Sequence, residues 1–395
     1  MRILFCNFEY PPLGGGGGVI TALLAEELAK THQVTVLTSR ADGLAPDAIE
    51  AGVRVMRVPV LLRRNRSTAS FISMFGYMLT GARAGKALLR SGGVDIINTH
   101  FVLPSGPVGA SLARFSGAPN VLSVHGGDLY DPSKWTSPHR HGPLRAWVRR
   151  LLVAADRVVG QSHNTLDNMR RIYTERSSPA LIPLGIRRPP DGVALRSDYG
   201  VGRDDFLLVT VGRLVGRKAI DQLITLLPAL GAGSVKLLVI GEGPHLGELR
   251  AQADALGVAG RIQFLGHLGE MEKFSVLRMA DLFVSTSQHE GFGLVFLEAM
   301  ACRLPVVCYD HGGQTDFLTD GETGGVVTLN DLRAFGDRCR QFIEQRELTA
   351  RVGAANARRV EEFFIDQCAA RYESLFQEVI EERRVQPNGG PSQRG

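Results

Sequence analysis

The residues with the clearest chemical potential are two glutamates, Glu290 and Glu298, in the stretch 288–301. An apolar run at 280–286 precedes them and is typical of a buried strand. Glu290 then falls in a turn with glycines, which let the main chain come close to a ligand. A helix predicted from about Leu294 carries Glu298 and begins with N–H groups that suit a phosphate. The stretch fits a site for both ends of a sugar nucleotide, although a strand, turn and helix with solvated acids fits it too.

Two cations follow a glycine at the end of another predicted strand. The strand at 206–211 leads into Gly212, and Arg213 and Lys218 lie in the loop and at the start of the next helix. Arginine through bidentate hydrogen bonds and lysine as a point charge can neutralise a diphosphate. The strand predicted at 236–240 leads into a similar turn, formed by Gly241, Glu242, Gly243 and Pro244.

The first half contains a glycine-rich counterpart. A strand predicted at 2–8 leads through Pro11 and Pro12 into five glycines at 14–18, and helical spacing of apolar residues begins at Val19. Such a loop exposes N–H groups beside the start of a helix and suits a phosphate. It is not the dinucleotide fingerprint, because the glycines are contiguous and no acid ends the second strand near position 38. Its place between strand and helix disfavours a flexible linker.

One histidine also lies at the end of a predicted strand. His125 closes the strand at 120–125 and is followed by Gly126, Gly127 and Asp128. A polar residue at the carboxyl end of a strand in an open α/β sheet points toward the ligand crevice. Structural and functional roles for His125 both stay open.

Strands alternate with helical segments along the whole chain, which predicts an α/β protein with parallel sheets. At 395 residues the chain is long enough for two domains. We expect a first domain at 1–186, a linker at 187–202, a second domain at 203–365, a final helix at 366–384 and a disordered tail at 385–395. The remaining strands are predicted at 33–38, 53–58, 94–99, 156–161, 261–265, 282–286 and 306–309, and the first sheet is expected to end at 181–186.

The composition is typical of a globular protein in the cytoplasm. No apolar run is long enough for a transmembrane helix, and the N-terminus lacks the pattern of a signal peptide. Five scattered cysteines without a C-x-x-C pair indicate reduced thiols. The sequence has no D-x-D pair, so neither a metal-bound diphosphate nor another metal site is indicated.

Charge is distributed unevenly. Residues 1–190 contain 23 Lys/Arg and 12 Asp/Glu, whereas the remainder contains 22 and 28. Nucleic acid is not favoured as the partner of the basic half, because no zinc finger or RNA-binding motif is present. An anionic membrane surface or an anionic acceptor fits at least as well. The basic and apolar stretch 61–90, with Arg63, Arg64 and Arg66 at its start, predicts either a helix on a membrane surface or an ordinary helix packed on the sheet.

Together, these motifs resemble those of the retaining GT-B glycosyltransferases of family 4, the glycosyl transferases group 1. The resemblance spans nearly the whole chain and rests on four motifs in order: Pro11 and Pro12 with the glycines at 14–18, His125 to Asp128, Gly212 to Leu214 with Lys218, and Glu290 to Gly293 with Glu298. It implies two Rossmann-like domains with parallel sheets facing each other across a cleft, and a C-terminal helix that crosses back to the first domain.

The resemblance also implies a role for each motif. Arg213 and Lys218 would hold the diphosphate of a UDP- or GDP-sugar donor, Glu290 the sugar hydroxyls and Glu298 the ribose. Glu242 would belong to the donor site too, and His125 would accept a hydrogen bond near C6 of the sugar. The main chain facing sugar and phosphate would come from Gly291, Phe292, Gly293 and Leu294. The loop closing on the donor phosphate would be formed by Gly15, Gly16, Gly17 and Gly18.

These roles imply transfer to one face of the sugar without a metal or other cofactor. A double displacement using both glutamates is disfavoured, because Glu298 is committed to the ribose. The acceptor hydroxyl is not identified. A lipid-linked or cell-envelope acceptor is the first expectation, and a small soluble acceptor, such as a sugar or a natural-product core, stays open. The alternatives are a sugar-nucleotide epimerase or hydrolase on the same fold, and a non-catalytic GT-B partner subunit.

The chain departs from the family pattern at three positions. Ala219 and Arg303 stand where glycine is usual, and Asp316 stands where a glutamate is common. Arg303 could supply a phosphate or acceptor contact, or could simply be a cation at the end of a helix. These changes put the preference for a particular donor sugar in doubt.

Overall fold

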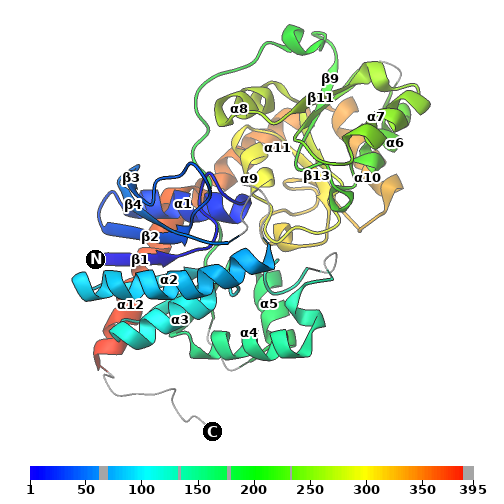
Figure 1. The fold of residues 1–395 in the computed structure, drawn as a ribbon. Helices are drawn as coiled ribbons and strands as arrows, with labels where there is room; N and C mark the ends of the chain where they lie inside the picture. The colour runs from blue at the N-terminus through cyan, green and yellow to red at the C-terminus, as the bar shows by residue number, and fades with distance from the viewer. Residues whose placement is uncertain (62–69, 132–134, 176–178, 232–233, 386–395) are drawn as a thin grey trace. The chain divides into compact units, whose positions relative to one another are not determined.

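The computed structural model describes residues 1–61, 70–131, 135–175, 179–231 and 234–385. The chain forms two compact units, Met1–Gly185 with Ile365–Gly395, and Ile186–Phe364 (Figure 1). Residues 187–202, predicted as a linker, are part of the second unit and include a short 3-10 helix at Arg196–Tyr199. The three arginines at 63–66 and the tail from 386 lie outside the described residues.

An eight-stranded sheet forms the centre of the first unit, in the order β3-β4-β2-β1-β5-β6-β7-β8. All neighbouring strands are parallel except β3 and β4. The strands are β1 (Arg2–Cys6), β2 (Gln33–Ser39), β3 (Asp47–Glu50), β4 (Val53–Val58), β5 (Ile96–His100), β6 (Asn120–Val124), β7 (Arg157–Gly160) and β8 (Pro179–Leu181).

Helices cover both faces of this sheet, because its buried strands carry apolar residues on both sides. Ile3 and Phe5 pack with α1 (Gly16–Leu28) and the final helix α12 (Ile365–Val385). Leu4 and Cys6 point the other way, toward α2 (Phe71–Ser91) and α3 (Ser105–Ser116). That layer continues with α4 (Gly142–Ala154) and α5 (His163–Ile172). The final helix is thus part of the core of the first unit, as Figure 1 shows in red.

The second unit contains a six-stranded, fully parallel sheet in the order β11-β10-β9-β12-β13-β14. Its strands are β9 (Phe206–Val211), β10 (Val235–Ile240), β11 (Ile262–Gly266), β12 (Leu282–Ser285), β13 (Val306–Tyr309) and β14 (Gly324–Val327). Its α-helices are α6 (Ile220–Leu226), α7 (Leu246–Ala255), α8 (Glu270–Met279), α9 (Leu294–Ala301), α10 (Leu332–Glu344) and α11 (Arg346–Arg359). The α/β class with parallel sheets is therefore confirmed.

Two local predictions need correction, and two strands were missed. The glycine run is not a loop up to residue 18, because α1 already begins at Gly16. The first sheet ends with β8 at 179–181, and Ile186 pairs instead with Phe364 in the second unit. Two strands were not predicted, β3 and β14. The first has acidic ends and only partial burial, and the second begins with two glycines that resemble a turn.

In both sheets the strand order reverses at an equivalent point. β1 lies between β2 and β5, and β9 lies between β10 and β12, so the strand order reverses beside β1 and beside β9. In open α/β sheets, ligands bind outside the carboxyl ends of the strands at this switch point. The loops that follow β1, β5 and β6 contain the motifs of the first unit, and those after β9 and β12 contain the motifs of the second. The topology of each unit therefore gathers its own motifs.

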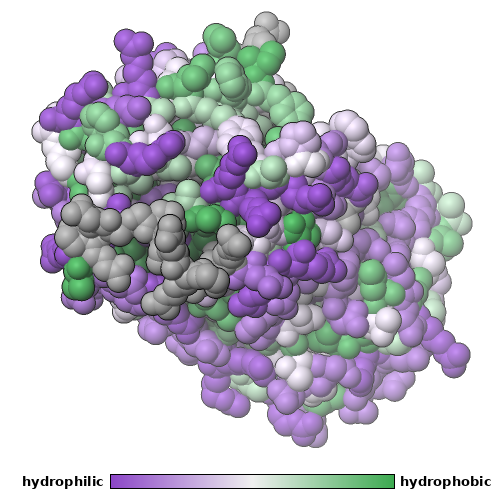
Figure 2. Space-filling model, turned by 90° about the horizontal axis from the view of Figure 1, so that it is seen from below, coloured by the Kyte–Doolittle hydropathy of each residue, from purple (hydrophilic) through white to green (hydrophobic). Residues whose placement is uncertain are grey.

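The surface combines apolar and charged side chains. Figure 2 shows hydrophobic and hydrophilic residues side by side on the face that it draws. Large exposed apolar side chains gather on α2, namely Phe71, Ile72, Phe75 and Leu79. Within the described residues, no helix combines the length and apolar content needed to cross a bilayer. All five cysteines are free and buried.

Net charge differs between the units less than between the two halves of the sequence. The first unit contains 25 Lys/Arg and 17 Asp/Glu, and the second contains 20 and 23. The acidic final helix belongs to the first unit, which reduces the contrast. The first unit nevertheless stays clearly basic.

Candidate functional site

In the second unit, Glu290 lies in the turn after β12 and is 8% exposed. Its carboxylate contacts the Lys218 ammonium directly, and Arg217 Nη1 lies 3.6 Å from Glu290 Oε2. Both cations come from the 3-10 turn Gly216–Lys218 that follows β9. We call Arg217, Lys218 and Glu290 the glutamate group. It brings an acid and two cations together at the switch point of the second sheet.

Main-chain hydrogen bonds join the three loops around this group. The Gln288 N–H donates to the Arg217 carbonyl at 2.9 Å, and the Gly313 N–H donates to the Glu290 carbonyl at 2.9 Å. Thr286 Oγ1 donates to the Ala219 carbonyl at 2.7 Å. Because these bonds fix the loops to one another, the charged side chains start from a rigid frame.

Opposing forces act on the ionisation of Glu290. Burial raises the pKa of its carboxyl, but Lys218 and Arg217 outweigh burial, and the net effect lowers the pKa. Glu290 is therefore ionised at neutral pH and forms an ion pair with Lys218. An anionic ligand of Lys218 would have to compete with this carboxylate.

Glu298 lies on α9 and has a cation of its own. Lys273 Nζ on α8 lies 2.6 Å from Glu298 Oε1. Burial raises the pKa of the Glu298 carboxyl, and the Lys273 charge offsets burial only in part. The two glutamates of the sequence motif therefore have separate partners and shifts in opposite directions.

Two predicted donor residues lie outside this contact network. Arg213 is exposed, and within the described residues its side chain makes no hydrogen bond or ion pair. Arg217, not Arg213, is the arginine beside Glu290. The exposed Glu242 side chain accepts a long hydrogen bond of 3.4 Å from the His267 N–H, while its carbonyl accepts from the Leu214 N–H at 2.9 Å.

The turn between Glu290 and α9 depends on a left-handed residue. Gly293 precedes Leu294, the first residue of α9, with φ +93°. A Cβ at this position would lie 2.4 Å from the Phe296 ring. Phe292 is 3% exposed and packs against Phe317, with ring centroids 5.1 Å apart. Only the main chain of this turn is therefore available to a ligand at Phe292.

The structure gives a physical meaning to two departures from the family pattern. Ala219 has φ +45° and Arg303 has φ +63°, so both adopt the left-handed conformation that favours glycine. Arg303 follows the end of α9, where the Leu304 N–H donates to the Ala299 carbonyl and the Arg303 N–H to the Met300 carbonyl. This is the hydrogen-bond pattern of a Schellman helix end. It fits the prediction that Arg303 is a cation at a helix terminus.

In the first unit, His125 follows β6 and is held from several sides. Its Nε2 lies 3.0 Å from His100 Nδ1, and its N–H donates to Asp128 Oδ1 at 2.9 Å. The Phe101 ring stacks on it with centroids 4.3 Å apart. We call Asn98, His100, Phe101, His125 and Asp128 the histidine group. It lies at the carboxyl ends of β5 and β6, and β5 is the neighbour of β1 on one side of the switch point.

Burial dominates the ionisation of this group. It lowers the pKa of His125 to about 4 and lowers the pKa of His100 well below its usual value. Burial also raises the pKa of Asp128 to about 6, against the effect of the backbone N–H groups that donate to it. Both imidazoles are therefore neutral at physiological pH.

The glycine run contacts this group through a single aromatic ring. A Cβ at Gly17 would lie 2.1 Å from Phe101 Cζ, whereas a Cβ at Gly15 or Gly16 would meet no atom within 4 Å. The Gly15 N–H donates to Glu9 Oε2 at 3.3 Å. Gly18 lies in the first turn of α1, and its N–H donates to the Gly15 carbonyl. The glycines and His125 are thus linked through Phe101.

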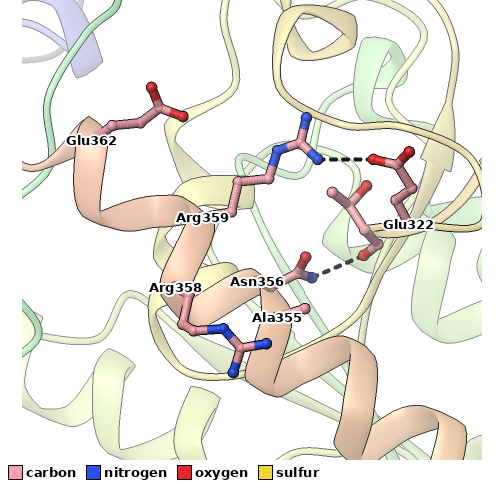
Figure 3. A pocket seen from close by; sticks show the side chains of 7 residues that line it. Glu322, Ala355, Asn356, Arg358, Arg359 and Glu362 are labelled. Atoms are coloured by element: carbon pink, nitrogen blue, oxygen red, sulfur yellow. Dashed lines mark hydrogen bonds and ion pairs between the residues drawn. The ribbon is translucent and has the colours of Figure 1, made fainter.

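Other features of the described residues do not add to the site. Among the residues that the structure describes, no three His, Cys, Asp or Glu side chains form a metal-binding cluster. A hollow of about 450 Å³ lies beside α11 (Figure 3), where Arg359 Nη1 reaches Glu322 Oε2 at 3.1 Å. Asn356 at its base donates to the Leu304 and Thr323 carbonyls. None of the sequence motifs lines this hollow.

Comparison with known proteins identifies the class. Residues 194–359 match the family described as "Glycosyl transferases group 1", and residues 14–188 match "Glycosyltransferase Family 4". Together these matches span most of the chain. The protein belongs to the family 4, group 1 glycosyltransferases, which confirms the family resemblance.

Individual relatives span nearly the full length. The chain is 29% identical to the GDP-mannose-dependent alpha-(1-6)-phosphatidylinositol monomannoside mannosyltransferase of Mycolicibacterium smegmatis, covering 89% of this chain and 92% of that protein. Its structure is similar to sucrose-phosphate synthase from Thermosynechococcus elongatus, with a TM-score of 0.83, 23% identity and coverage of 96% and 99%. It is also similar to Anabaena HepE in complex with UDP-glucose, with a TM-score of 0.75, 20% identity and coverage of 96% and 100%. These likenesses confirm the GT-B fold.

Several residues that contact the predicted site residues were not themselves predicted from the sequence. Lys273 lies on a helix with no motif, and only the fold brings it to Glu298. Asn98 and His100 are buried within β5, and their alternation along a strand was the only signal available. Arg217 is adjacent to Lys218 in the sequence, but only the structure distinguishes it from Arg213 as the arginine beside Glu290.

Proposed function

We propose that this protein is a retaining, metal-independent glycosyltransferase that moves a sugar from a nucleotide-sugar donor to an acceptor hydroxyl. The observation that carries the proposal is the buried contact between Lys218 and Glu290 at the switch point of the second sheet. Lys218, a cation that can bind a diphosphate, and Glu290, an acid that can bind sugar hydroxyls, thus lie side by side. Family membership supports this division of roles.

Each predicted residue has a place in the proposal. Lys218 and Arg213 hold the diphosphate, Glu290 binds sugar hydroxyls and Glu298 binds the ribose. Glu242 and the main chain of Gly291, Phe292, Gly293 and Leu294 complete the donor contacts of the second unit. From the first unit, His125 binds a sugar hydroxyl and the glycines Gly15, Gly16, Gly17 and Gly18 supply N–H groups. The mannosyltransferase relative named for GDP-mannose and the structure containing UDP-glucose support UDP- or GDP-sugars as donors.

Donor binding would exchange one anion for another at Lys218. In the free protein Glu290 neutralises this cation, and a diphosphate would take over part of that role. The Glu290 carboxylate would then accept hydrogen bonds from sugar hydroxyls. This exchange couples recognition of the sugar to recognition of the phosphate.

The proposed reaction breaks the bond between the anomeric carbon and the diphosphate oxygen. The acceptor oxygen bonds to the same face of the anomeric carbon, and its proton passes to a phosphate oxygen of the leaving group. Cations and main-chain N–H groups stabilise the charge that develops on the diphosphate. Glu298 is paired with Lys273, which argues against its use as a second carboxylate in a double displacement.

Calorimetric titration with UDP and GDP in the presence of EDTA tests the donor site. We expect one nucleotide to bind and Lys218→Ala to weaken that binding at least tenfold, because a charge-assisted contact is lost. Lys236→Ala is the matched control, since it removes a cation of the same unit on β10, remote from Glu290. NMR of the product anomer then tests retention, and inversion at the anomeric carbon would refute the proposed mechanism.

We also propose that the acceptor is lipid-linked or part of the cell envelope, and that the first unit touches anionic membranes. One stripe of α2 supports this. Phe71, Phe75 and Leu79 recur every four residues and are 60–71% exposed, and Arg83 and Arg90 continue the same stripe. The opposite face packs into the unit through Tyr77, Gly81 and Gly85. One face of the helix therefore packs on the unit, and the other face presents the apolar and basic side chains that a membrane-surface helix would need.

Vesicle co-sedimentation tests this surface. We expect stronger binding to anionic than to neutral vesicles and a loss of the difference at high salt, because screening weakens the attraction. Phe71→Ser with Phe75→Ser should reduce binding to both kinds of vesicle, and Arg83→Gln with Arg90→Gln should reduce only the anionic preference. Equal binding to both vesicles by the unmodified protein would refute the electrostatic part.

A further inference from the structure

Polar side chains in the first unit form one continuous hydrogen-bonded chain that ends at His125. Strands β5 and β6 are neighbours, and His100 lies opposite Ser123 in their register. His100 Nε2 lies 2.7 Å from Asn98 Oδ1, and His100 Nδ1 lies 3.0 Å from His125 Nε2. Beyond Asn98 the chain continues to Ser123 at 3.1 Å and from there to Tyr372 of the final helix at 3.0 Å.

The orientation of the Asn98 amide determines which ring nitrogens of His100 and His125 carry a proton. Asn98 Nδ2 donates to the Val121 carbonyl at 3.1 Å, which fixes the orientation of the amide. Asn98 Oδ1 can therefore only accept, and His100 must donate from Nε2. A neutral His100 then has a lone pair at Nδ1, where it accepts from His125 Nε2. A neutral His125 in turn has its lone pair at Nδ1.

Packing keeps both rings in these orientations. Phe101 stacks on His125, and Phe5 stacks on His100 with centroids 5.5 Å apart. Asn98 is completely buried and His100 is 1% exposed, so water cannot replace the hydrogen bond between them. Burial lowers the pKa of both histidines, which supports the neutral forms that the deduction requires.

We propose that Asn98 and His100 are positioning residues that hold His125 as its Nε2–H tautomer, with Nδ1 as a fixed hydrogen-bond acceptor. This proposal rests on the proposed function, in which the ligand of the acceptor is a hydroxyl of the transferred sugar. The acceptor favours a donor sugar with a hydroxyl at that place over a deoxy analogue, because the analogue would leave this fixed acceptor without a hydrogen-bond donor. The specificity of the site thus depends on two residues that do not touch the substrate.

The tautomer is measured directly on the free, unmodified protein by NMR of ¹⁵N-histidine-labelled samples. Among the ten histidines, the His125 signals are identified by their loss in His125→Gln. We expect a proton on Nε2 and a lone pair on Nδ1 of both His125 and His100. A proton on His125 Nδ1 would overturn the proposal, and this measurement requires neither substrate nor turnover.

Asn98→Asp should reverse the direction of the hydrogen bond between His100 and His125. The introduced carboxylate stabilises a second proton on His100, which then donates from Nδ1 to His125 Nε2. His125 is thereby forced into its Nδ1–H tautomer and loses its acceptor. An unchanged His125 tautomer in a folded Asn98→Asp variant would contradict the relay.

Thr99→Val is the matched control for Asn98→Asp. Thr99 lies on the same strand, and its Oγ1 donates to Asn120 Oδ1 at 2.7 Å, away from the histidines. We expect kcat/KM for the donor to fall about tenfold in Asn98→Asp, as for one lost hydrogen bond, and less than about twofold in Thr99→Val. Equal losses in both variants would indicate a purely structural role for Asn98. Absence of donor turnover in the unmodified protein would refute the proposed function while leaving the tautomer result valid.

Discussion

The histidine group and the glutamate group both lie at the carboxyl ends of strands in two similar sheets, yet they are stabilised in opposite ways. In the first unit burial keeps His100 and His125 neutral, and hydrogen bonds assign a partner to both ring nitrogens of His100 and to Nε2 of His125. In the second unit burial opposes the charge on Glu290, and two cations outweigh it. A neutral chain fixes proton positions, whereas an ion pair can exchange one partner for a ligand. The same topology thus supports both precise hydrogen bonding and reversible charge binding.

The largest effect is expected from breaking the ion pair of the second unit. Lys218→Ala leaves Glu290 buried without its main partner, which should cost about 3–5 kcal/mol of stability. Turnover of the donor should fall by about 10²-fold or more, because the charge on the leaving diphosphate loses its stabilising cation. Urea denaturation and donor kinetics measure the two losses separately.

A double variant separates these two consequences. Lys218→Met combined with Glu290→Gln removes both charges and should recover most of the stability, while turnover stays low. Recovery of turnover together with stability would mean that the pair is structural only.

Low pH should lower the stability of the first unit, because the folded state keeps His125 neutral. The pKa of His125 is lowered to about 4 by burial, so the unfolded chain binds more protons between the two pKa values. The stabilisation is fully present above the ordinary pKa of about 6.5 and is lost as pH falls toward 4. Between pH 7.5 and 5 the loss should be about 2 kcal/mol relative to His125→Gln. Parallel pH profiles of the two proteins in urea denaturation would contradict the shift.

Alanine substitutions at two adjacent glycines of α1 should change the stability of the protein in opposite directions. Gly17→Ala would force the Phe101 ring away and should destabilise the protein by about 1–2 kcal/mol. Gly16→Ala meets no atom within 4 Å and should stabilise by about 0.5–1 kcal/mol, because alanine favours a helix. Thermal denaturation of the two variants tests this, and equal shifts would show that Gly17 and Phe101 are not in contact.

The smallest effect concerns the two left-handed residues of the second unit. Ala219→Gly and Arg303→Gly should each stabilise by about 1 kcal/mol, since glycine adopts a positive φ without strain. Ala299→Gly, inside α9, is the control and should destabilise by at least a similar amount. Destabilisation by all three changes would contradict the assigned backbone conformations.

Much of the second unit could be predicted because its signals are local. The strand before Glu290, the glycine turn and the helix from Leu294 follow one another within 20 residues, and β12 and α9 appear as expected. Lys218 was found because cations after a glycine at a strand end have a direct chemical meaning. Lys273 was not, since only the packing of α8 against α9 brings it to Glu298.

The first unit was predicted less completely, because its chemistry depends on buried pairs between strands. His125 was noticed at its strand end, but its partners Asn98 and His100 belong to a strand that resembles any buried strand. Their relation to His125 requires the register of β5 and β6, which no local pattern specifies. The edge strand β3 of this unit was also missed, and so was the edge strand β14 of the second unit, because edge strands need few apolar residues.

A screen of nucleotide release from UDP-glucose, UDP-N-acetylglucosamine, UDP-galactose, GDP-mannose and ADP-glucose tests the central claim most directly. Each donor is incubated with the protein with and without EDTA, and Glu290→Gln serves as the site variant. We expect one donor to be turned over, equally well in EDTA, and the activity to be lost in Glu290→Gln. Release that requires a divalent metal, or no release from any donor together with no nucleotide binding, would contradict a metal-independent transferase built on Lys218 and Glu290.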